Sequence, residues 1–252
     1  MQHTTSSPMP MVQTYGITKS FGSICALQGV DFAVAPGQIV AIVGDNGSGK
    51  STFIKILSGS LKPDSGSIWI DGREYKSLNA RQSLQAGIST VYQDLSLDNY
   101  CDVAENIFLG NELTTGGIFL QRRKMRRIAQ DLIDELDIGI PDITLPVGAF
   151  SGGQRQAVAV ARSVYHGKRL VILDEPTAAM GVRESAAVLK LITKLAQRNM
   201  AVVIICHNLH QVFSIADKIC IMRHGRIIRT ALTTDTSLDE VQQMIVEADL
   251  ID

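Results

Sequence analysis

The sequence has no long apolar run and almost no net charge. The apolar run from Ala201 to Cys206 has the length of a buried strand, and no run approaches the ~18 residues that a membrane helix needs. The formal net charge of −1 gives no electrostatic indication of a nucleic-acid or anionic-membrane surface. These absences predict a soluble, cytoplasmic protein that has no nucleic-acid partner and reaches a membrane only through another protein.

Cysteine is also sparse, and the first residues lack a targeting signal. The chain holds four widely spaced cysteines without a C-x-x-C pair: Cys25, Cys101, Cys206 and Cys220. This spacing argues against a disulfide framework and predicts reduced thiols, as in cytosolic proteins. The stretch from Met1 to Pro10 lacks the apolar middle of a signal peptide, so residues 1–11 are expected to form a disordered tail.

A complete phosphate-binding motif is present near the N-terminus. The pattern G-x-x-x-x-G-K-[ST] is matched by Gly44, Asp45, Asn46, Gly47, Ser48, Gly49, Lys50 and Ser51, followed by Thr52. An apolar run of strand length precedes it and a helical pattern follows, which is the context that a P-loop needs. Its backbone N–H groups would cradle phosphates, Lys50 would reach the β- and γ-phosphates, and the Ser51 hydroxyl would hold Mg²⁺. The motif predicts that the chain binds a nucleoside triphosphate.

The remaining patterns predict an α/β fold. With 45% hydrophobic residues the chain can bury a sizeable core. Leu170 to Asp174 and Ala201 to His207 are apolar strands separated by an amphipathic helix, Glu184 to Gln197, which predicts a parallel sheet. We expect a P-loop NTPase core with a mainly parallel sheet, an N-terminal antiparallel β subdomain and an inserted helical subdomain at about 94–167.

The end of the chain has simpler patterns. Ile219 to Met222 and Gly225 to Ile228 predict a hairpin-like pair of strands. A C-terminal helix is expected over 236–252, with Ser237 as N-cap and Glu240 completing a capping box.

Three side chains at strand ends are candidates for chemistry on a bound triphosphate. Asp174 ends a strand that we expect to lie beside the P-loop strand, so its carboxylate could reach Mg²⁺. Glu175 would face the γ-phosphate as general base or water-positioning residue. His207 ends the next strand at the same sheet edge and could hydrogen-bond the γ-phosphate. The alternative is a pair of exposed acids and a surface histidine.

Two other features have two interpretations each. Phe21 precedes Gly44 by twenty-three positions and could stack on an adenine ring, or it is an ordinary aromatic at a strand end. The basic run from Arg122 to Arg127 could contact nucleic acid, but acidic residues follow it on the same helical pattern. A solvated helix face is therefore the favoured interpretation of the basic run.

The stretch from Phe150 to Gln156, lying before Asp174 and Glu175, resembles the signature sequence of nucleotide-binding subunits of ATP-binding cassette (ABC) transporters. The resemblance covers roughly Val12 to Ile228 and implies a single ABC ATPase domain over 12–235. It also implies that the signature contacts the γ-phosphate of an ATP held by the opposite subunit, through Ser151, Gly152, Gly153 and Gln154.

The resemblance assigns further roles to single residues. Phe21 falls at the family's adenine-stacking aromatic, and Gln93 at the glutamine that contacts Mg²⁺ and the attacking water. Glu175 matches the catalytic base and His207 the switch histidine. The segment from Asp94 to Gly110 lies where the family's subunits receive a helix of the membrane protein. One departure is Gly181, which cannot supply the carboxylate that helps connect the two ATP sites in the family.

Two stretches resemble sugar importers of the ribose and fructose type: Val91 to Gly110 and Glu175 to Val182. This resemblance implies an ATPase that couples ATP hydrolysis to uptake of a solute, most simply a monosaccharide. The implied partners are a transmembrane permease, a second copy or another ABC ATPase, and a periplasmic solute-binding protein, with the chain peripheral on the inner face of the cell membrane. Alternatives are a non-sugar solute, export, a non-transport ABC ATPase and a regulatory nucleotide-binding module without turnover.

Overall fold

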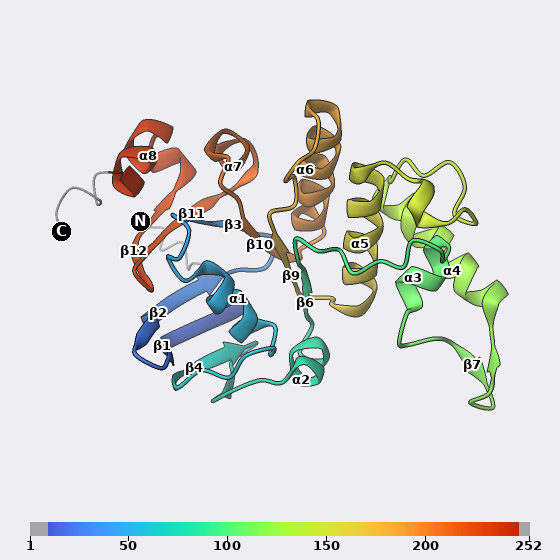
Figure 1. The fold of residues 1–252 in the computed structure, drawn as a ribbon, viewed down its shortest axis with the longest axis horizontal. Helices are drawn as coiled ribbons and strands as arrows, with labels where there is room; N and C mark the ends of the chain where they lie inside the picture. Colours follow the sequence, from blue (N-terminus) through green and yellow to red (C-terminus); the bar gives the residue numbers. More distant parts are fainter. Residues whose placement is uncertain (1–9, 247–252) are drawn as a thin grey trace, which may run out of the picture.

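The computed structural model describes residues 10–246 and has a six-stranded sheet at its centre (Figure 1). All neighbouring strands of this sheet are parallel except β11 and β12, which pair antiparallel at one edge. This arrangement confirms the expected α/β fold with a mainly parallel sheet. In spatial order the strands are β12 (Arg226–Leu232), β11 (Lys218–Arg223), β3 (Ile39–Val43), β10 (Ala201–Ile205), β9 (Leu170–Asp174) and β6 (Ile88–Val91).

The order of the strands corrects one expectation. Asp174 does not end a strand next to the P-loop strand, because β10 lies between β3 and β9. Ile204 of β10 pairs with Ala41 on one side and with Leu173 on the other. The other edge of β9 pairs with β6, so β9 has no free edge for β3. The two strands are both neighbours of β10 and do not touch each other. His207, which follows β10, is therefore one strand nearer to the P-loop than Asp174.

A second sheet of four antiparallel strands, in the order β2-β1-β4-β5, packs against the central sheet. It confirms the expected antiparallel β subdomain, and its first hairpin includes Phe21 at the end of β1. Irregular register and exposed polar side chains hide the alternation there. The strands are β1 (Val12–Phe21), β2 (Ile24–Val34), β4 (Ser65–Ile70) and β5 (Arg73–Tyr75).

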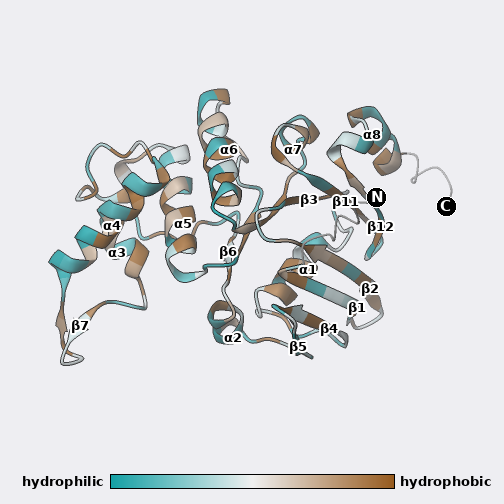
Figure 2. Ribbon diagram, turned by 180° about the vertical axis from the view of Figure 1, so that it is seen from behind, coloured by the Kyte–Doolittle hydropathy of each residue, from teal (hydrophilic) through white to brown (hydrophobic). Residues whose placement is uncertain are grey.

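The central sheet separates two apolar cores. On β3 the side chains of Ile39 and Val43 enter the core under the long helices, whereas Val40 and Ile42 enter the core under the antiparallel sheet. Central strands are coloured brown in Figure 2, as expected for strands covered on both faces. The helices of the first core are α3 (Val103–Phe108), α4 (Arg122–Leu136), α5 (Gly152–His166), α6 (Val182–Gln197), α7 (Leu209–Ile215) and α8 (Leu238–Val246); α1 (Lys50–Leu57) belongs to the second.

The region expected to be helical contains one element that the sequence did not predict. A hairpin of two-residue strands, β7 (Thr114–Thr115) and β8 (Phe119–Leu120), projects between α3 and α4 (Figure 1). Such short strands leave no periodicity to read. The remaining short elements are α2 (Ala80–Gln85) and two 3₁₀ turns, Val147–Ala149 and Thr233–Asp235.

Both chain ends extend past the described residues. The expected tail lies mostly outside them, but Met11 is described and its N–H donates to the Val34 carbonyl (2.7 Å). At the other end, Ser237 and Glu240 form the expected capping box, and the last part of the predicted helix lies outside the described residues. Within residues 10–246 no helix combines the length and apolarity needed to span a bilayer.

Candidate functional site

The phosphate-binding loop connects β3 to α1 and relies on backbone that only glycine adopts easily. Gly44 has φ 146°, Gly47 has φ 81° and Gly49 has φ 107°. A Cβ on Gly44 would lie 2.0 Å from the Met222 carbonyl oxygen, so β11 leaves no room for a side chain. The loop is thereby closely packed against the strand beside it.

The turn between β11 and β12 is hydrogen-bonded to the P-loop. The N–H of Gly225 donates to the Ser48 carbonyl (2.9 Å), and the Gly225 carbonyl accepts from the Gln28 N–H (2.8 Å). This turn joins the P-loop to the antiparallel sheet. Sequence reasoning missed its role, since a His-Gly pair between two apolar runs indicates only a turn.

The ammonium group of Lys50 lies inside the loop. Its Nζ donates to the carbonyls of Gly44 and Asp45, both at 2.7 Å, and to Ser48 Oγ at 3.3 Å. The residue is only 6% exposed. Burial lowers the pKa of Lys50, while the nearby carboxylates of Asp45, Glu175 and Asp174 favour its charged form. The sequence therefore places a partly buried cation where the P-loop can bind an anion.

The strand-end residues share one hollow with the P-loop. This hollow, of about 300 Å³, brings Lys50 and Ser51 together with Gln93, Asp174 and His207. Its complete lining is Ala26, Asn46, Gly47, Ser48, Gly49, Lys50, Ser51, Thr52, Gln93, Asp174, Glu175, Ile205 and His207. Five chain segments thus supply one polar cavity beside the start of α1. The hydroxyl, amide and carboxylate oxygens of Ser51, Gln93 and Asp174 are ligand types that suit Mg²⁺.

Asp174 carries an unfavourable charge in this hollow. Burial raises the pKa of its carboxyl group, and the neighbouring Glu175 carboxylate raises it further. Lys50 and His207 act in the opposite direction. A carboxylate in such surroundings gains from a nearby cation.

The side chains of Glu175 and His207 lie in close polar contact. The distance from His207 Nε2 to Glu175 Oε1 is 2.7 Å. Glu175 has φ 51°, an uncommon conformation for a residue with a side chain, and its N–H donates to the Ile205 carbonyl (2.9 Å). The strained backbone turns this carboxylate into the hollow, where a group held by a histidine could accept a proton from water.

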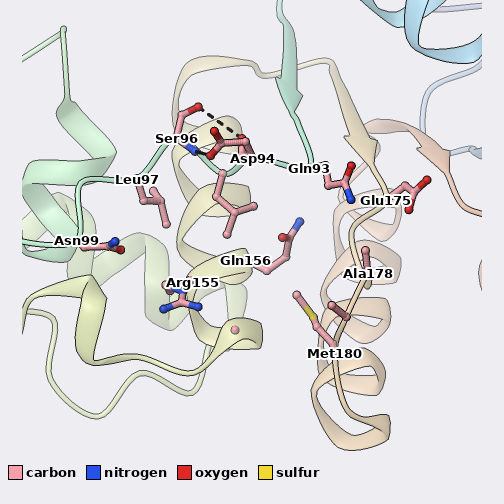
Figure 3. A pocket seen from close by; sticks show the side chains of 13 residues that line it. Gln93, Asp94, Ser96, Leu97, Asn99, Arg155, Gln156, Glu175, Ala178 and Met180 are labelled. Atoms are coloured by element: carbon pink, nitrogen blue, oxygen red, sulfur yellow. Dashed lines mark hydrogen bonds between the residues drawn. The ribbon is translucent and has the colours of Figure 1, made fainter.

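A larger hollow of about 530 Å³ adjoins the first one, and both are lined by Gln93 and Glu175 (Figure 3). It extends along the segment after Gln93 as far as Asn99 and is bordered on its other side by Arg155 and Met180. A partly buried arginine connects this segment to the helix behind it. Arg162 of α5 donates to the carbonyls of Leu95 (2.6 Å) and Ser96 (2.8 Å).

The residues of the signature sequence lie at the start of α5. Ser151 is its N-cap: its Oγ accepts from the Gln154 N–H (3.4 Å), and Gln154 Oε1 accepts from the Ser151 N–H (3.0 Å). Ser151 is exposed. Among the described residues, Ser151, Gly152, Gly153 and Gln154 contribute nothing to the lining of the P-loop hollow.

Glu184 contacts the signature loop and was not singled out from the sequence. Its carboxylate accepts hydrogen bonds from the Ser151 hydroxyl and from the Gly181 N–H, the latter at 3.4 Å, and these bonds lower the pKa of Glu184. A Cβ on Gly153 would lie 3.1 Å from Glu184 Cβ. Glu184 follows the helix start at Gly181 by three positions, which is the capping-box spacing and could have identified it.

Phe21, like the signature residues, lies outside the hollow at the P-loop. It ends β1, is 50% exposed, and its ring lies 5.7 Å from Lys19 Nζ. It does not belong to the hollow's lining in the described structure.

Comparisons with known proteins agree with this geometry. Residues 27–178 match the model of a family described as ABC transporter. The chain is 43% identical over 237 residues to the xylose/arabinose import ATP-binding protein of Sulfolobus acidocaldarius, covering 93% of each. It is 43% identical over 224 residues to the fructose import ATP-binding protein of Rhizobium meliloti, covering 86% of each. It is 38% identical to the ribose import ATP-binding protein of Yersinia pestis, covering 97% of this chain but 48% of that protein.

Solved structures show the same fold. A nucleotide-free ATP-binding cassette from an ABC transporter superimposes with a TM-score of 0.81 at 24% identity and covers 95% of this chain and 96% of its own. The ADP conformation of another ABC transporter cassette, MJ1267, gives a TM-score of 0.80 at 23% identity over 97% of this chain and all of that chain (100%). The match of more than half the chain to the family model and the two relatives at 43% identity lead to one conclusion: the chain belongs to the ABC transporter family, as one of its ATP-hydrolysing cassettes.

Proposed function

We propose that this chain is the ATPase subunit of a monosaccharide importer. The observation that carries the site assignment is that Lys50, Asp174, Glu175 and His207 share one hollow at the P-loop. The sugar class is supported by the relatives, which are import ATP-binding proteins for xylose and arabinose, fructose, and ribose.

Each residue of the hollow has a role that its chemistry suits. The P-loop backbone from Gly44 to Thr52 and the Lys50 ammonium bind the phosphates of ATP. Glu175 accepts a proton from the attacking water, and its close contact with His207 keeps the carboxylate aimed at the hollow. Phe21, at the edge of the antiparallel sheet, stacks on the adenine ring.

Ser51, Gln93 and Asp174 would hold Mg²⁺, which neutralises charge on the phosphates when it is bound. The raised pKa of Asp174 supports this assignment, because a carboxylate that is costly to ionise gains most from a cation. Gln93 also lines the larger hollow, so a change at the phosphates can reach the segment that follows it.

Two cassettes share each ATP in this proposal. Ser151, Gly152, Gly153 and Gln154 of one copy complete the site of the other, since these donors do not line the P-loop hollow of their own chain. The partner cassette is a second copy or another ABC ATPase. ATP joins the two because both faces gain contacts to the same phosphate.

The other partners follow from the import function. A transmembrane permease receives the motion through the segment from Asp94 to Gly110, and a periplasmic solute-binding protein delivers the sugar. The cassette is thereby held at the inner face of the cell membrane, and it has no nucleic-acid partner. Co-purification with a permease and stimulation of ATP hydrolysis by a sugar-loaded binding protein would support this assignment. Co-purification with nucleic acid would contradict it.

The shared site can be tested by mixing two inactive variants. Lys50→Ala damages the P-loop half of a site and Ser151→Ala the signature half. A mixed dimer carries both lesions in one site and none in the other. If the copies mix at random, hydrolysis should recover to about a quarter of the wild-type rate. Pairing is monitored by fluorescence transfer between labelled copies. Activity no higher than that of either variant alone, with pairing demonstrated, would disprove the shared site.

A further inference from the structure

The β7–β8 hairpin presents apolar side chains to the solvent. Ile118 is 78% exposed, Phe119 is 74% exposed and Leu120 is 47% exposed. Single exposed apolar residues need no explanation, but three in succession at the tip of a projection form a patch. We call Ile118, Phe119 and Leu120 the hairpin tip. In Figure 1 the hairpin extends away from the body of the protein beyond α4.

The hairpin is held in a defined conformation. Thr114 pairs with Leu120 and Thr115 with Phe119. Gln121, the N-cap of α4, ties both ends together: its N–H donates to the Leu113 carbonyl and its Nε2 to the Thr114 carbonyl, each at 2.8 Å. The apolar tip is therefore presented outward by ordered backbone, and most of the side-chain surface of Ile118 and Phe119 stays exposed.

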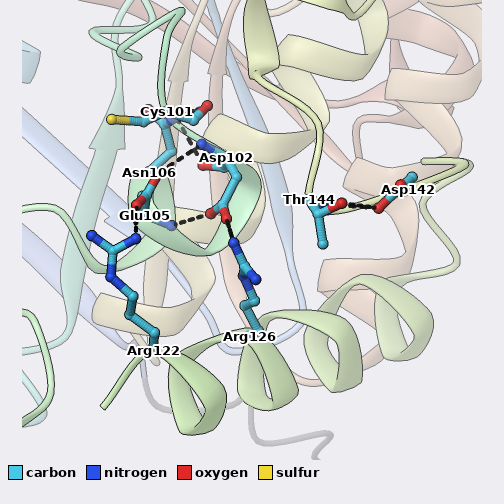
Figure 4. Close-up of polar contacts among 8 residues, drawn as sticks. All are labelled: Cys101, Asp102, Glu105, Asn106, Arg122, Arg126, Asp142 and Thr144. Atoms are coloured by element: carbon cyan, nitrogen blue, oxygen red, sulfur yellow. Dashed lines mark hydrogen bonds and ion pairs between the residues drawn. The ribbon is translucent and has the colours of Figure 1, made fainter. Parts of the chain in front are cut away.

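The first turns of α4, next to the tip, are strongly basic. Residues 113–127 contain five arginine or lysine residues and no acidic residue. Two of the five form ion pairs with residues of the fold: Arg122 pairs with Glu105 (3.3 Å) and Arg126 with Asp102 (2.9 Å) (Figure 4).

The other three basic residues are exposed, and the described residues form no ion pair with them: Arg123, Lys124 and Arg127. In Figure 2 the hairpin leads from brown residues directly into the teal start of α4.

The acidic residues of α4 offset only part of this group. The first of them, Asp131, lies at 1.5 Å per residue ~6 Å along the axis from Arg127, within the ~8–10 Å over which charges act in physiological salt, but ~10–12 Å from Lys124 and Arg123. Glu135 pairs with Arg198 (2.7 Å) and Asp137 with Lys194 (2.6 Å) at the far end of the helix. Arg123, Lys124 and Arg127 are exposed, as the solvated-face interpretation of the basic run expects, and the acids of α4 leave Arg123 and Lys124 without a counter-charge on this helix.

One acid lies near the hairpin on its other side. Glu112 is exposed and its Oε1 accepts from the Gly110 N–H (3.0 Å). Three exposed cations against the carboxylates of Glu112 and Asp131 leave a net positive patch beside the hairpin tip.

We propose that the hairpin tip and the three exposed basic residues bind an anionic lipid surface directly. A bilayer interface satisfies both halves of the patch at once, because apolar side chains enter the acyl boundary while Arg and Lys contact phosphate groups. Nucleic acid would match only the basic half. A projecting tip also suits a fluid interface better than a preformed protein groove. This contact would be separate from the permease, and weak by itself, so its effect is to orient a cassette that is already held at the membrane.

The test uses the full-length protein and vesicles of phosphatidylcholine, with or without phosphatidylglycerol. Co-sedimentation is expected only with the anionic vesicles and should disappear at high salt. The triple change Arg123→Gln, Lys124→Gln and Arg127→Gln should lower the partition coefficient about fivefold per charge removed. Ile118→Ser with Phe119→Ser should lower it about tenfold or more. A matched control is Ile24→Ser, at a residue 69% exposed elsewhere on the surface, which should bind like wild type.

A second measurement reports insertion of the tip itself. The emission of a Phe119→Trp variant should shift to the blue with anionic vesicles and stay unchanged with neutral ones. No vesicle binding by the wild type, equal binding by the hairpin variants, or no emission shift would each overturn the proposal. So would variants that lose only association with a detergent-solubilised permease, since the patch would then be a protein contact. Hydrolysis by the soluble protein is measured in parallel. It should be unchanged in every variant, which separates this proposal from the ATPase assignment.

Discussion

His207 Nε2 lies 2.7 Å from Glu175 Oε1, so the side chain that follows β10 orients the carboxylate that follows β9. The two strands are neighbours, and Ile205 at the end of β10 pairs with Asp174 at the end of β9. This contact therefore joins two adjacent strand ends at the edge of the sheet where the P-loop also lies. A carboxylate in contact with a histidine differs from the free surface acid that the sequence left open as an alternative.

Replacing Glu175 by glutamine should separate binding from turnover. The amide keeps the shape of the side chain but cannot accept a proton, so hydrolysis should fall about 10²–10⁴-fold while ATP still binds. Phosphate release and nucleotide-binding assays measure the two effects. Glu74→Gln, at an exposed carboxylate paired with Lys76 (2.7 Å), is a control that should keep full activity. Near-normal steady-state hydrolysis by the Glu175 variant would exclude Glu175 as the base.

Asp174→Asn should stabilise the protein while weakening Mg²⁺-ATP binding. Because the pKa of Asp174 is raised, the folded protein takes up this proton before the unfolded chain does as the pH falls. The ionised carboxylate therefore lowers the free energy of unfolding near neutral pH, and this destabilisation disappears in mild acid, where the group is protonated. The variant should gain about 0.5–2 kcal/mol near neutral pH in the absence of nucleotide, and less in acid.

Thermal unfolding at the two pH values, with Mg²⁺-ATP titrations, checks this prediction. The same carboxylate must be ionised to hold a cation, so the wild-type protein should also lose Mg²⁺ affinity toward acid pH. A variant that is less stable than wild type near neutral pH would show that the charge of Asp174 is already compensated.

Two glycines of the P-loop should respond very differently to alanine. At Gly44 the added Cβ would meet the Met222 carbonyl at 2.0 Å, so Gly44→Ala should cost about 3 kcal/mol or more and abolish nucleotide binding. At Gly47 nothing lies within 4 Å of the added Cβ, and only the positive φ of 81° opposes the change. Gly47→Ala should therefore cost about 1–2 kcal/mol. Urea unfolding of both variants measures the difference, and equal costs would contradict the close packing of the loop on β11.

Removing the charge of Glu184 should tighten the ATP-bound dimer. Its carboxylate bonds to the Ser151 hydroxyl, where the proposed function places the γ-phosphate of a partner's ATP. Glu184→Gln, made in the Glu175→Gln background, should strengthen ATP-dependent association about two- to fivefold, because one anion near the phosphate is lost. Size-exclusion chromatography across protein concentrations measures the effect, with Glu240→Gln as a distant control. Weaker association would mean that Glu184 supports the signature loop in its binding conformation.

Local patterns in the sequence predicted the features that are determined by residues close together along the chain. The helical pattern that contains the basic run is α4, Arg122–Leu136, and one face of that helix meets the core along its whole length. The capping box at Ser237 and the P-loop between a strand and a helix are likewise set by residues a few positions apart. The parallel sheet followed from two continuous apolar runs.

Features that depend on packing could not be predicted in this way. Both β9 and β10 look like buried strands, and only the pairing of Ile204 with Ala41 and Leu173 shows which of them lies beside the P-loop strand. The contact of Glu184 with Ser151 joins two helix starts that are far apart in the sequence. The hairpin tip was hidden for another reason: its strands are too short to show a period, and Gly116-Gly117 marks only a turn.

The two neighbours of β3 have a consequence for how the protein is made. Both β10 and β11 come from the last quarter of the chain, and the Gly225 turn that holds Ser48 comes later still. The phosphate-binding loop therefore leaves the ribosome long before the strands that hold it are translated. A nascent chain halted before β11 would carry the whole motif and yet lack the support that shapes it, so the capacity to bind ATP arises only after β10, β11 and the Gly225 turn have been made.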